Sequence, residues 1–324
     1  MASHSVQQHH REKLPDGRTE VSAGPGVSRP PSQFPDARHP LEPQVLHHFL
    51  TNTCFTLALR ADPAKCRVWP VLMPQVAEAS LCVRQSLIAI SAIHLCRLGH
   101  PESKKLYQLA CEYAVGSSVR FRESVANISR MNCLEVIAFS VNTAIFGFTV
   151  SLSPGRPESV LPFNPMETLR VMRSFGGLIE NLDKVVSERD VDSMFYLEDK
   201  FQDPLQQDVL DKTLTDLDEL EARIRETSLD KTARHAPTYS AAVIALRKWA
   251  IVVSGRPWLW KQFIIWPAMA PSEYLGLLEE GYPTAVEIFV HWCNIMKRAP
   301  SRWYLLPWLE KSIAEVQGSV ETVT

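Results

Sequence analysis

The spacing of apolar residues is the strongest constraint on the fold of this chain. From residue 44 onward these residues recur at intervals of three and four positions, as Val45, Leu46, Phe49 and Leu50 do at the start of the region. A repeat near 3.6 residues places them on one face of a helix, whereas a half-buried strand needs a strict period of two. No long stretch of the sequence has that alternation. The spacing therefore predicts an all-α fold, with a single large multi-helix domain over residues 44–324.

Glycine, proline and capping residues mark where individual helices begin and end. Pro101 suits the first position of a helix because it has no amide hydrogen to leave unpaired there. Asn132 and Glu135 have the spacing of a capping pair, and we expect Gly176 and Gly177 to interrupt the helix in which they lie. The predicted helices are Leu81–Leu98, Glu102–Asn127, Leu134–Val150, a segment from Asn164, a segment around Leu210–Ile224, Tyr239–Ser254, Ala285–Lys297 and Tyr304–Gln317.

Residues 1–43 differ from the rest of the chain in composition. They hold seven of the 23 prolines and three of the 13 glycines, with almost no apolar periodicity. Such a segment has too little apolar surface to offset the entropy lost on ordering, so we expect a disordered arm. Its positive charges are offset by negative ones, which does not favour a DNA-binding arm. Its first residues are polar, so we expect no secretion signal.

The overall charge gives no reason to expect attraction to nucleic acid or to an anionic membrane, because the formal net charge is only −2. Residues 183–230 are nevertheless strongly acidic, with fifteen Asp and Glu against six Lys and Arg. Leu214, Leu217 and Leu220 follow helical spacing within this segment. We expect a surface helix with one buried stripe, and an acidic interaction or activation segment is the alternative.

The cysteines and the most apolar segment both indicate an intracellular core. Seven scattered cysteines with no CxxC pair are typical of buried free thiols, and they predict neither a disulfide framework nor a zinc or other metal site. The twenty residues 136–155 carry no charge, but polar residues limit the apolar part to about fifteen, fewer than the ~20 that a membrane span needs. We therefore expect a core helix and no membrane span.

The sequence contains none of the common catalytic motifs. It has no GxSxG, HExxH, phosphate loop or usable GxGxxG. If distant residues did converge on an acid–base pair, the candidates would be His94, Glu135, Tyr274 and His291. We therefore expect no enzyme activity and no cofactor.

Two ordered sets of motifs carry information beyond composition. The first set comprises LHHFLTNT at residues 46–53, Trp69-Pro70, the run SLIAISAIHLC that ends at Cys96, and then Tyr107 and Ala110. The second set is Arg256-Pro257-Trp258, Ile265-Trp266-Pro267, Tyr274–Leu278, Pro283–Val286, His291-Trp292-Cys293, Trp303-Tyr304 and Trp308-Leu309. In this order, the two sets resemble the regulatory domain of fungal-specific transcription factors, and the sterol uptake control regulators are the most similar branch. The resemblance covers about residues 44–318.

The resemblance implies an all-helical regulatory domain that controls transcription and is commonly dimeric. In the sterol branch, an apolar pocket holds a sterol, and its occupancy governs whether the protein stays in the cytosol or enters the nucleus. For this chain the resemblance therefore implies a nuclear protein that shuttles with the cytoplasm. It also implies a homodimer, or a heterodimer with a zinc-cluster regulator, and a sterol-like apolar ligand.

One departure from the family concerns DNA binding. Family members usually begin with a six-cysteine zinc cluster whose basic helix reads the major groove. Residues 1–53 contain no cysteine, and the later cysteines have the wrong spacing for such a cluster. We therefore expect no direct DNA contact from this chain, which would act through a partner. A naturally truncated regulator and a gene model that lost an upstream exon both explain the departure.

The expected ligand pocket combines aromatic residues from the C-terminal part with the apolar helix at 134–150. Each of these residues also has a plain interpretation as a core residue. A non-nuclear small-molecule carrier is the alternative function, followed by an accessory enzyme of secondary metabolism. The predicted ligand-binding residues are Phe139, Phe146, Trp266, Tyr274, Trp292, Met296 and Trp303.

Overall fold

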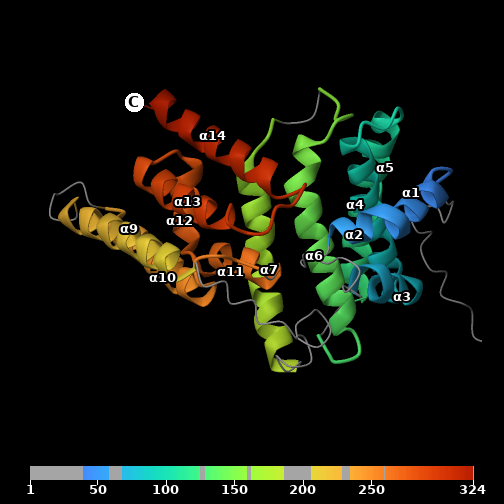
Figure 1. Ribbon diagram of the computed structural model, residues 1–324, viewed down its shortest axis with the longest axis horizontal. Coiled ribbons are helices and arrows are strands. Elements are labelled where there is room, and N and C mark those ends of the chain that lie inside the picture. The colour runs from blue at the N-terminus through green and yellow to red at the C-terminus, as the bar shows by residue number, and fades with distance from the viewer. Residues whose placement is uncertain are drawn as a thin grey trace, which may run out of the picture. The chain divides into compact units, whose positions relative to one another are not determined.

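The computed structural model describes residues 39–57, 68–124, 128–158, 162–185, 206–227, 234–258 and 260–323. All regular elements in these ranges are helical, and they contain no strand, which confirms the predicted all-α class (Figure 1). The predicted disordered arm lies almost entirely outside these ranges. The elements are α1 (Glu42–His48), η1 (Phe49–Thr53), α2 (Cys54–Thr56), η3 (Val68–Leu72), α3 (Met73–Ala79), α4 (Leu81–Arg97), α5 (Ser103–Ser124), α6 (Cys133–Thr149), η4 (Val150–Leu152), α7 (Pro165–Val185), α9 (Gln206–Thr227), α10 (Ala236–Val252), α11 (Trp260–Met269), α12 (Ser272–Glu279), α13 (Pro283–Met296) and α14 (Leu306–Val323).

Helix α4 lies at the centre of the N-terminal helices. Thirteen of its 17 residues are buried, and α1, α3, α5 and α6 all pack against it. Ser80 begins the helix by accepting a hydrogen bond at its Oγ from the backbone amide of Val83. Gly99 follows the end of the helix with a positive φ of 78°, which a glycine adopts without steric cost. These bounds confirm the helix predicted over Leu81–Leu98.

Helix α6 and the short turn after it form the most apolar segment of the described chain. Cys133–Leu152 is long and apolar enough to cross a membrane by length and composition, yet 56% of its most apolar window is buried inside the protein. Helices α3, α4, α5 and α7 pack against α6. A helix covered by its own protein in this way is a core helix, as the sequence predicted.

The predicted capping pair before α6 is wrong in its details. The Asn132 side chain makes no capping hydrogen bond, and its Oδ1 instead accepts hydrogen bonds from the amide and hydroxyl of Ser129. Glu135 accepts a hydrogen bond from Ser80 Oγ over 2.7 Å, which joins α6 to the beginning of α4. Pro101 lies in the turn before α5, which begins two residues later at Ser103. In each case a tertiary or turn contact replaces the expected local one.

Helix α7 runs through its two glycines without the predicted interruption. A Cβ built on Gly176 would lie 2.6 Å from the Cβ of Ala268 on α11, so this glycine allows the two helices to approach closely. The Arg173 side chain on α7 donates to the backbone carbonyls of Pro267 and Ala270 at the end of α11. Gly176 is therefore a packing residue within a continuous helix, and it does not end the helix.

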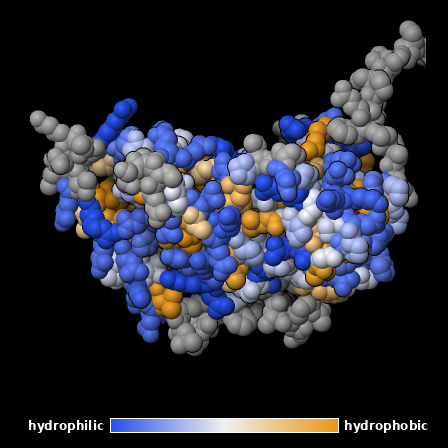
Figure 2. Space-filling view, turned by 90° about the horizontal axis from the view of Figure 1, so that it is seen from above, coloured by the Kyte–Doolittle hydropathy of each residue, from blue (hydrophilic) through white to orange (hydrophobic). Residues whose placement is uncertain are grey.

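Helix α9 has the predicted form of an acidic surface helix with one apolar stripe. Leu217, Leu220 and Ile224 are buried, and the helix packs against α10. Its polar face forms ion pairs with neighbouring helices, including the pair between Asp218 and Arg247 on α10. The part of the acidic segment at residues 186–205 lies outside the described residues. Figure 2 shows one face of the molecule, on which hydrophobic spots are separated by hydrophilic residues.

The two glycines of α7 provide a matched pair of substitutions. We expect Gly176→Ala to lower the free energy of unfolding by about 1–3 kcal/mol, because the added methyl group forces α7 and α11 apart. Gly177 has open space around its Cβ direction. Gly177→Ala should therefore stabilise the protein by about 0.5–1 kcal/mol, since alanine is the better helix former. Urea denaturation of both variants measures the difference, and equal effects would contradict the close approach.

Candidate functional site

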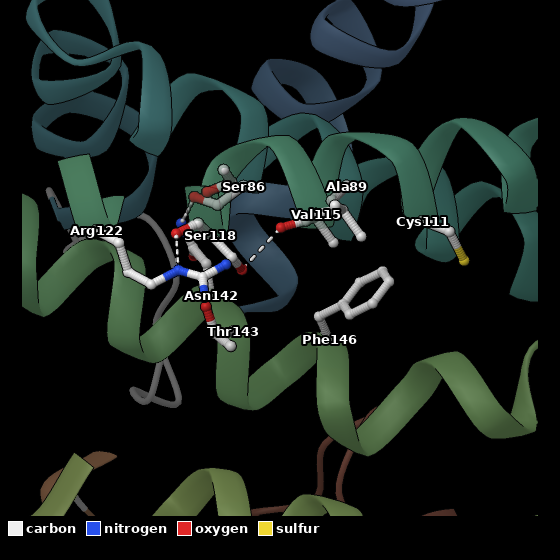
Figure 3. Close-up of a pocket in the computed structure, with 11 residues that line it drawn as sticks. Ser86, Ala89, Cys111, Val115, Ser118, Arg122, Asn142, Thr143 and Phe146 are labelled. Atoms are coloured by element: carbon white, nitrogen blue, oxygen red, sulfur yellow. Dashed lines mark hydrogen bonds between the residues drawn. The ribbon is translucent and has the colours of Figure 1, made fainter. Parts of the chain in front are cut away.

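A pocket of about 370 Å³ lies between α4, α5 and α6. Its volume falls in the range of ~300–1,000 Å³ that is typical of small-molecule sites. The pocket is partly open to solvent, and Figure 3 shows the side chains around it. The residues that line it are Ser86, Ala89, Cys111, Ala114, Val115, Ser117, Ser118, Arg122, Asn142, Thr143 and Phe146.

The pocket has a polar end and an apolar end. In the view of Figure 3, Arg122, Asn142 and Thr143 gather on one side, while Cys111 and Phe146 lie on the other. The helices explain this separation, because Cys111 and Arg122 are eleven residues apart on α5, or about 16 Å along its axis. Burial raises the pKa of the Cys111 thiol, so the apolar end stays uncharged at neutral pH.

A chain of hydrogen bonds fixes the orientation of the Asn142 amide. The Ser86 hydroxyl donates to the backbone carbonyl of Val83 over 2.7 Å, and Ser86 Oγ accepts from Asn142 Nδ2 over 2.7 Å. Because the only hydroxyl proton of Ser86 is already committed, a flipped amide would bring two acceptors together. The Oδ1 atom therefore faces away from Ser86. This oxygen is buried and has no hydrogen-bond partner among the described residues, and Asn142 as a whole is only 1% exposed.

Arg122 supplies the positive charge at the polar end. Its Nε donates to the backbone carbonyl of Ser118 one turn earlier, over 3.2 Å. This bond holds the side chain along α5, and Arg122 as a whole is exposed to solvent. Ser117 on the same helix donates to the backbone carbonyl of Cys82, which fixes α5 against α4. The polar end is thus held by backbone contacts on both helices.

Of the seven predicted ligand-binding residues, Phe146 lines this pocket and the others lie elsewhere. Phe139 is buried and stacks on Phe121, with ring centroids 4.0 Å apart. Trp266, Tyr274, Trp292 and Met296 are fully buried in the main core. Trp292 stacks on Trp266 at 5.2 Å, and Tyr274 meets Trp266 edge to face at 5.7 Å. Four of the seven therefore pack in one region of the core, and their role in ligand binding stays a prediction.

The sequence interpretation missed the polar lining residues. Asn142 is one of the polar residues that shorten the apolar part of residues 136–155, and nothing in the sequence analysis singled out Arg122. One sequence signal pointed to Asn142, namely the presence of an amide in a helix predicted to be buried. Such an amide needs partners for both its donor and its acceptor. The position of Arg122 on the same pocket depends on how α5 packs against α6, and no local pattern encodes that contact.

The seventh predicted residue, Trp303, belongs to a second polar cluster beside α4. Its indole ring stacks on His94 with centroids 4.7 Å apart, and its Nε1 donates to Thr56 Oγ1 over 3.0 Å. Nδ1 of His94 lies 2.9 Å from Thr53 Oγ1 and 3.3 Å from Nε2 of His48. Burial, followed by the nearby His48 and then Arg97, lowers the pKa of His94 to about 4. His94 is therefore neutral at pH 7 and serves as a hydrogen-bonded packing residue.

Two other candidates for acid–base chemistry, Tyr274 and His291, lie on α12 and α13. Tyr274 donates its phenolic hydrogen to the backbone carbonyl of Ala285, and burial raises its pKa well above 10. Burial lowers the pKa of His291 on α13, against the opposite influence of Glu287. Within the part of the chain that the structure describes, no group of three or more His, Cys, Asp or Glu side chains could hold a metal ion. Burial also raises the pKa of the Cys82 thiol to about 12.

Comparisons of the chain with family models, with curated proteins and with solved structures found no match. The resemblance described above therefore remains a prediction that rests on the motifs themselves.

The tryptophan cluster yields a prediction about the predicted ligand residue Trp292. Its side chain is fully buried, and its Nε1 has no hydrogen-bond partner among the described residues. We expect Trp292→Ala to lower the free energy of unfolding by about 3–5 kcal/mol through the cavity it leaves. Trp292→Phe should cost clearly less, because it retains an aromatic ring and removes the unpaired donor. Thermal and urea unfolding compare the two variants. An alanine variant that keeps its stability would contradict a packing role.

The lowered pKa of His94 predicts a dependence of stability on pH. Between about pH 6.5 and pH 4, an unfolded histidine takes up a proton that the folded His94 does not bind. The unfolded state then binds more protons, so stability falls as pH falls through this window, by up to about 1.4 kcal/mol per pH unit. Above pH 6.5 this contribution is constant.

His94→Phe and His47→Phe test this prediction as a matched pair. The first retains a ring beside Trp303 and removes the titrating group, while the second changes an exposed histidine on α1. Urea denaturation at pH 7 and pH 5 should show a smaller difference between the two pH values for His94→Phe than for the wild-type protein. His47→Phe should match the wild type. The same pH dependence in all three proteins would show that His94 is not the group responsible.

Proposed function

We propose that this chain is a transcription-regulatory protein of the fungal zinc-cluster kind, acting in the nucleus. It contacts promoters through a zinc-cluster partner, or through a zinc-cluster module not contained in these 324 residues. A small molecule bound between α4, α5 and α6 modulates this action. No catalytic step is part of the proposal.

The observation that carries the proposal is the contact between the two sets of motifs behind the resemblance. His94 belongs to the first set and Trp303 to the second, and their rings stack at 4.7 Å. Trp303 also bonds to Thr56, which is 247 residues away in the sequence and three residues after the end of the LHHFLTNT motif. Both sets of motifs therefore belong to one folded domain. Their meeting supports one regulatory domain over the length that the resemblance covers.

An exposed apolar strip on α10 supports action through a partner. Ile244, Ile251 and Val252 are 41%, 51% and 67% exposed, and the first two lie two turns apart on the same side of the helix. Exposed apolar residues in one place often mark a protein interface. The proposal therefore places the partner, a zinc-cluster protein or a second copy, on this strip.

The experiment is chromatin immunoprecipitation of the tagged protein in a fungal host, with identification of the proteins that co-purify. We expect promoter enrichment together with a zinc-cluster protein. Ile251→Glu should abolish both the binding of the partner and the enrichment at promoters, because it places a charge on the apolar strip. Met131→Glu is the matched control, since Met131 is an exposed apolar residue ahead of α6.

Two outcomes would contradict the proposal. The first is the absence of promoter enrichment under every growth condition in which the protein is expressed. The second is that Met131→Glu and Ile251→Glu weaken partner binding equally. That result would contradict a specific role of the α10 strip. Under the first outcome the pocket would favour the alternative, a small-molecule carrier with no nuclear role. Localisation by fluorescence would then show a protein that stays outside the nucleus.

A further inference from the structure

Helix α10 is apolar on its covered side and also on the side that it exposes. Its covered side packs against α9, α11, α12 and α13. A surface helix normally turns charged residues to water, whereas a helix that is apolar all round is covered by protein. The exposed side of α10 therefore has the composition of a contact surface, with Lys248 as its one charged residue. The six exposed residues of the helix are Pro237, Ala241, Ile244, Lys248, Ile251 and Val252.

The exposed residues follow the spacing of a contact between two helices. From Pro237 to Ile251 the intervals between them are four, three, four and three positions. Helices that pack side by side at a small angle repeat their contacts in this way, every 3.5 residues on average. The repeat extends over about 21 Å of the helix, which matches a partner helix of about four turns. We call these five residues the α10 seam: Pro237, Ala241, Ile244, Lys248 and Ile251.

Lys248 sets a requirement on the charge of the partner helix. Among the described residues, its ammonium group forms neither an ion pair nor a hydrogen bond. The neighbouring Arg247 differs, because it pairs with Asp218 on α9. A helix laid on the seam removes water from around the ammonium group, and an uncompensated charge there opposes binding. A carboxylate on the partner helix that faces Lys248 offsets this cost.

The same lysine argues against a second copy of this chain as the partner. In a parallel pair of α10 helices each seam residue meets its own counterpart, so two Lys248 side chains meet. In an antiparallel pair that packs Ile244 on Ile251, the two-fold axis passes beside Lys248 and again brings the two lysines together. Like charges placed together in an interface suppress the wrong pairing. A single lysine in an apolar seam selects among partners in this way.

We propose that the α10 seam binds an amphipathic helix of another protein, one with apolar residues at three- and four-residue spacing and a carboxylate that faces Lys248. Ile244 and Ile251 supply the apolar contacts, while Lys248 selects the acidic partner and prevents self-association. This inference rests on the proposed function insofar as it states which kind of surface the transcription partner presents to α10. The binding itself requires no DNA.

The first test measures the binding of two synthetic helical peptides to the purified full-length chain by fluorescence anisotropy. Both peptides are three heptads long with leucine at the seam positions, and they differ only at the central one, which is glutamate in the first and lysine in the second. Nanomolar concentrations of labelled peptide keep the peptides from pairing with themselves. We expect saturable binding of the glutamate peptide and at least tenfold weaker binding of the lysine peptide.

Variants of the seam test the roles of its residues in the same assay. Lys248→Glu should reverse the preference, so that the lysine peptide binds at least tenfold more tightly than the glutamate peptide. Ile251→Glu should weaken the binding of both peptides at least tenfold. Lys104→Glu is the matched control, because Lys104 is an exposed lysine on α5, and it should retain the wild-type preference. Circular dichroism checks that each variant remains folded.

The second test examines self-association by sedimentation velocity. Lys248→Ile makes the seam apolar throughout, so we expect this variant to self-associate at concentrations at which the wild-type chain does not. Addition of Ile251→Glu to the Lys248→Ile chain should reverse the association. The wild-type chain and the Ile251→Glu variant should have the same mass, because the wild-type seam does not pair with itself.

Three outcomes would overturn the inference. Absence of binding by both peptides would remove the seam as a docking surface, and equal binding of the two by the wild-type chain would remove the role of Lys248. A wild-type dimer that Ile251→Glu dissociates would identify a second copy as the occupant. These results are separable from those on chromatin. Peptide binding with charge reversal, but without promoter enrichment, retains the seam and loses the proposed function. Promoter enrichment that Lys248→Glu leaves unchanged gives the reverse.

Discussion

Helix α4 has to be covered on nearly every side, and this requirement organises the N-terminal half of the molecule. A helix with thirteen buried residues out of 17 has no solvent face, so α1, α3, α5 and α6 must surround it. The surrounding helices attach through a few polar contacts in addition to the apolar ones. Glu42 of α1 is an example, because it is buried against Arg84 of α4 and Tyr113 of α5. Burial of α4 thus determines where its neighbours lie.

The few polar residues of α4 acquire their importance from the same burial. Ser86 and Ser91 cannot reach water, so each needs a partner inside the protein. Ser86 fixes the Asn142 amide, while Ser91 donates to the carbonyl of Val45 and approaches Thr53. The first contact shapes the polar end of the pocket. The second belongs to the cluster around His94, so a single helix supports both the pocket and the His94 cluster.

Side-chain size distinguishes the packing around the pocket from the packing of the C-terminal helices. In the C-terminal helices, Trp249, Trp266, Trp292 and Trp308 pack on one another and fill the space between α10, α11, α13 and α14. Large flat side chains fill a core densely. Around the pocket, α4 and α5 instead present alanine and serine, whose small side chains leave room between the helices.

The sequence by itself determined the helical class, the bounds of α4, the core character of α6 and the buried stripe of α9, because the order of apolar, polar and glycine residues within one segment encodes each of them. The sequence also singled out the aromatic residues Trp266, Tyr274 and Trp292, although it could not separate a core residue from a ligand contact. Only the tertiary structure decided that α7 continues through Gly176, because the reason is a methyl group on α11. It alone brought Arg122 and Asn142 to one pocket and Trp303 to His94. Those pairs lie 20 and 209 positions apart in the sequence, and their meeting depends on how whole helices pack.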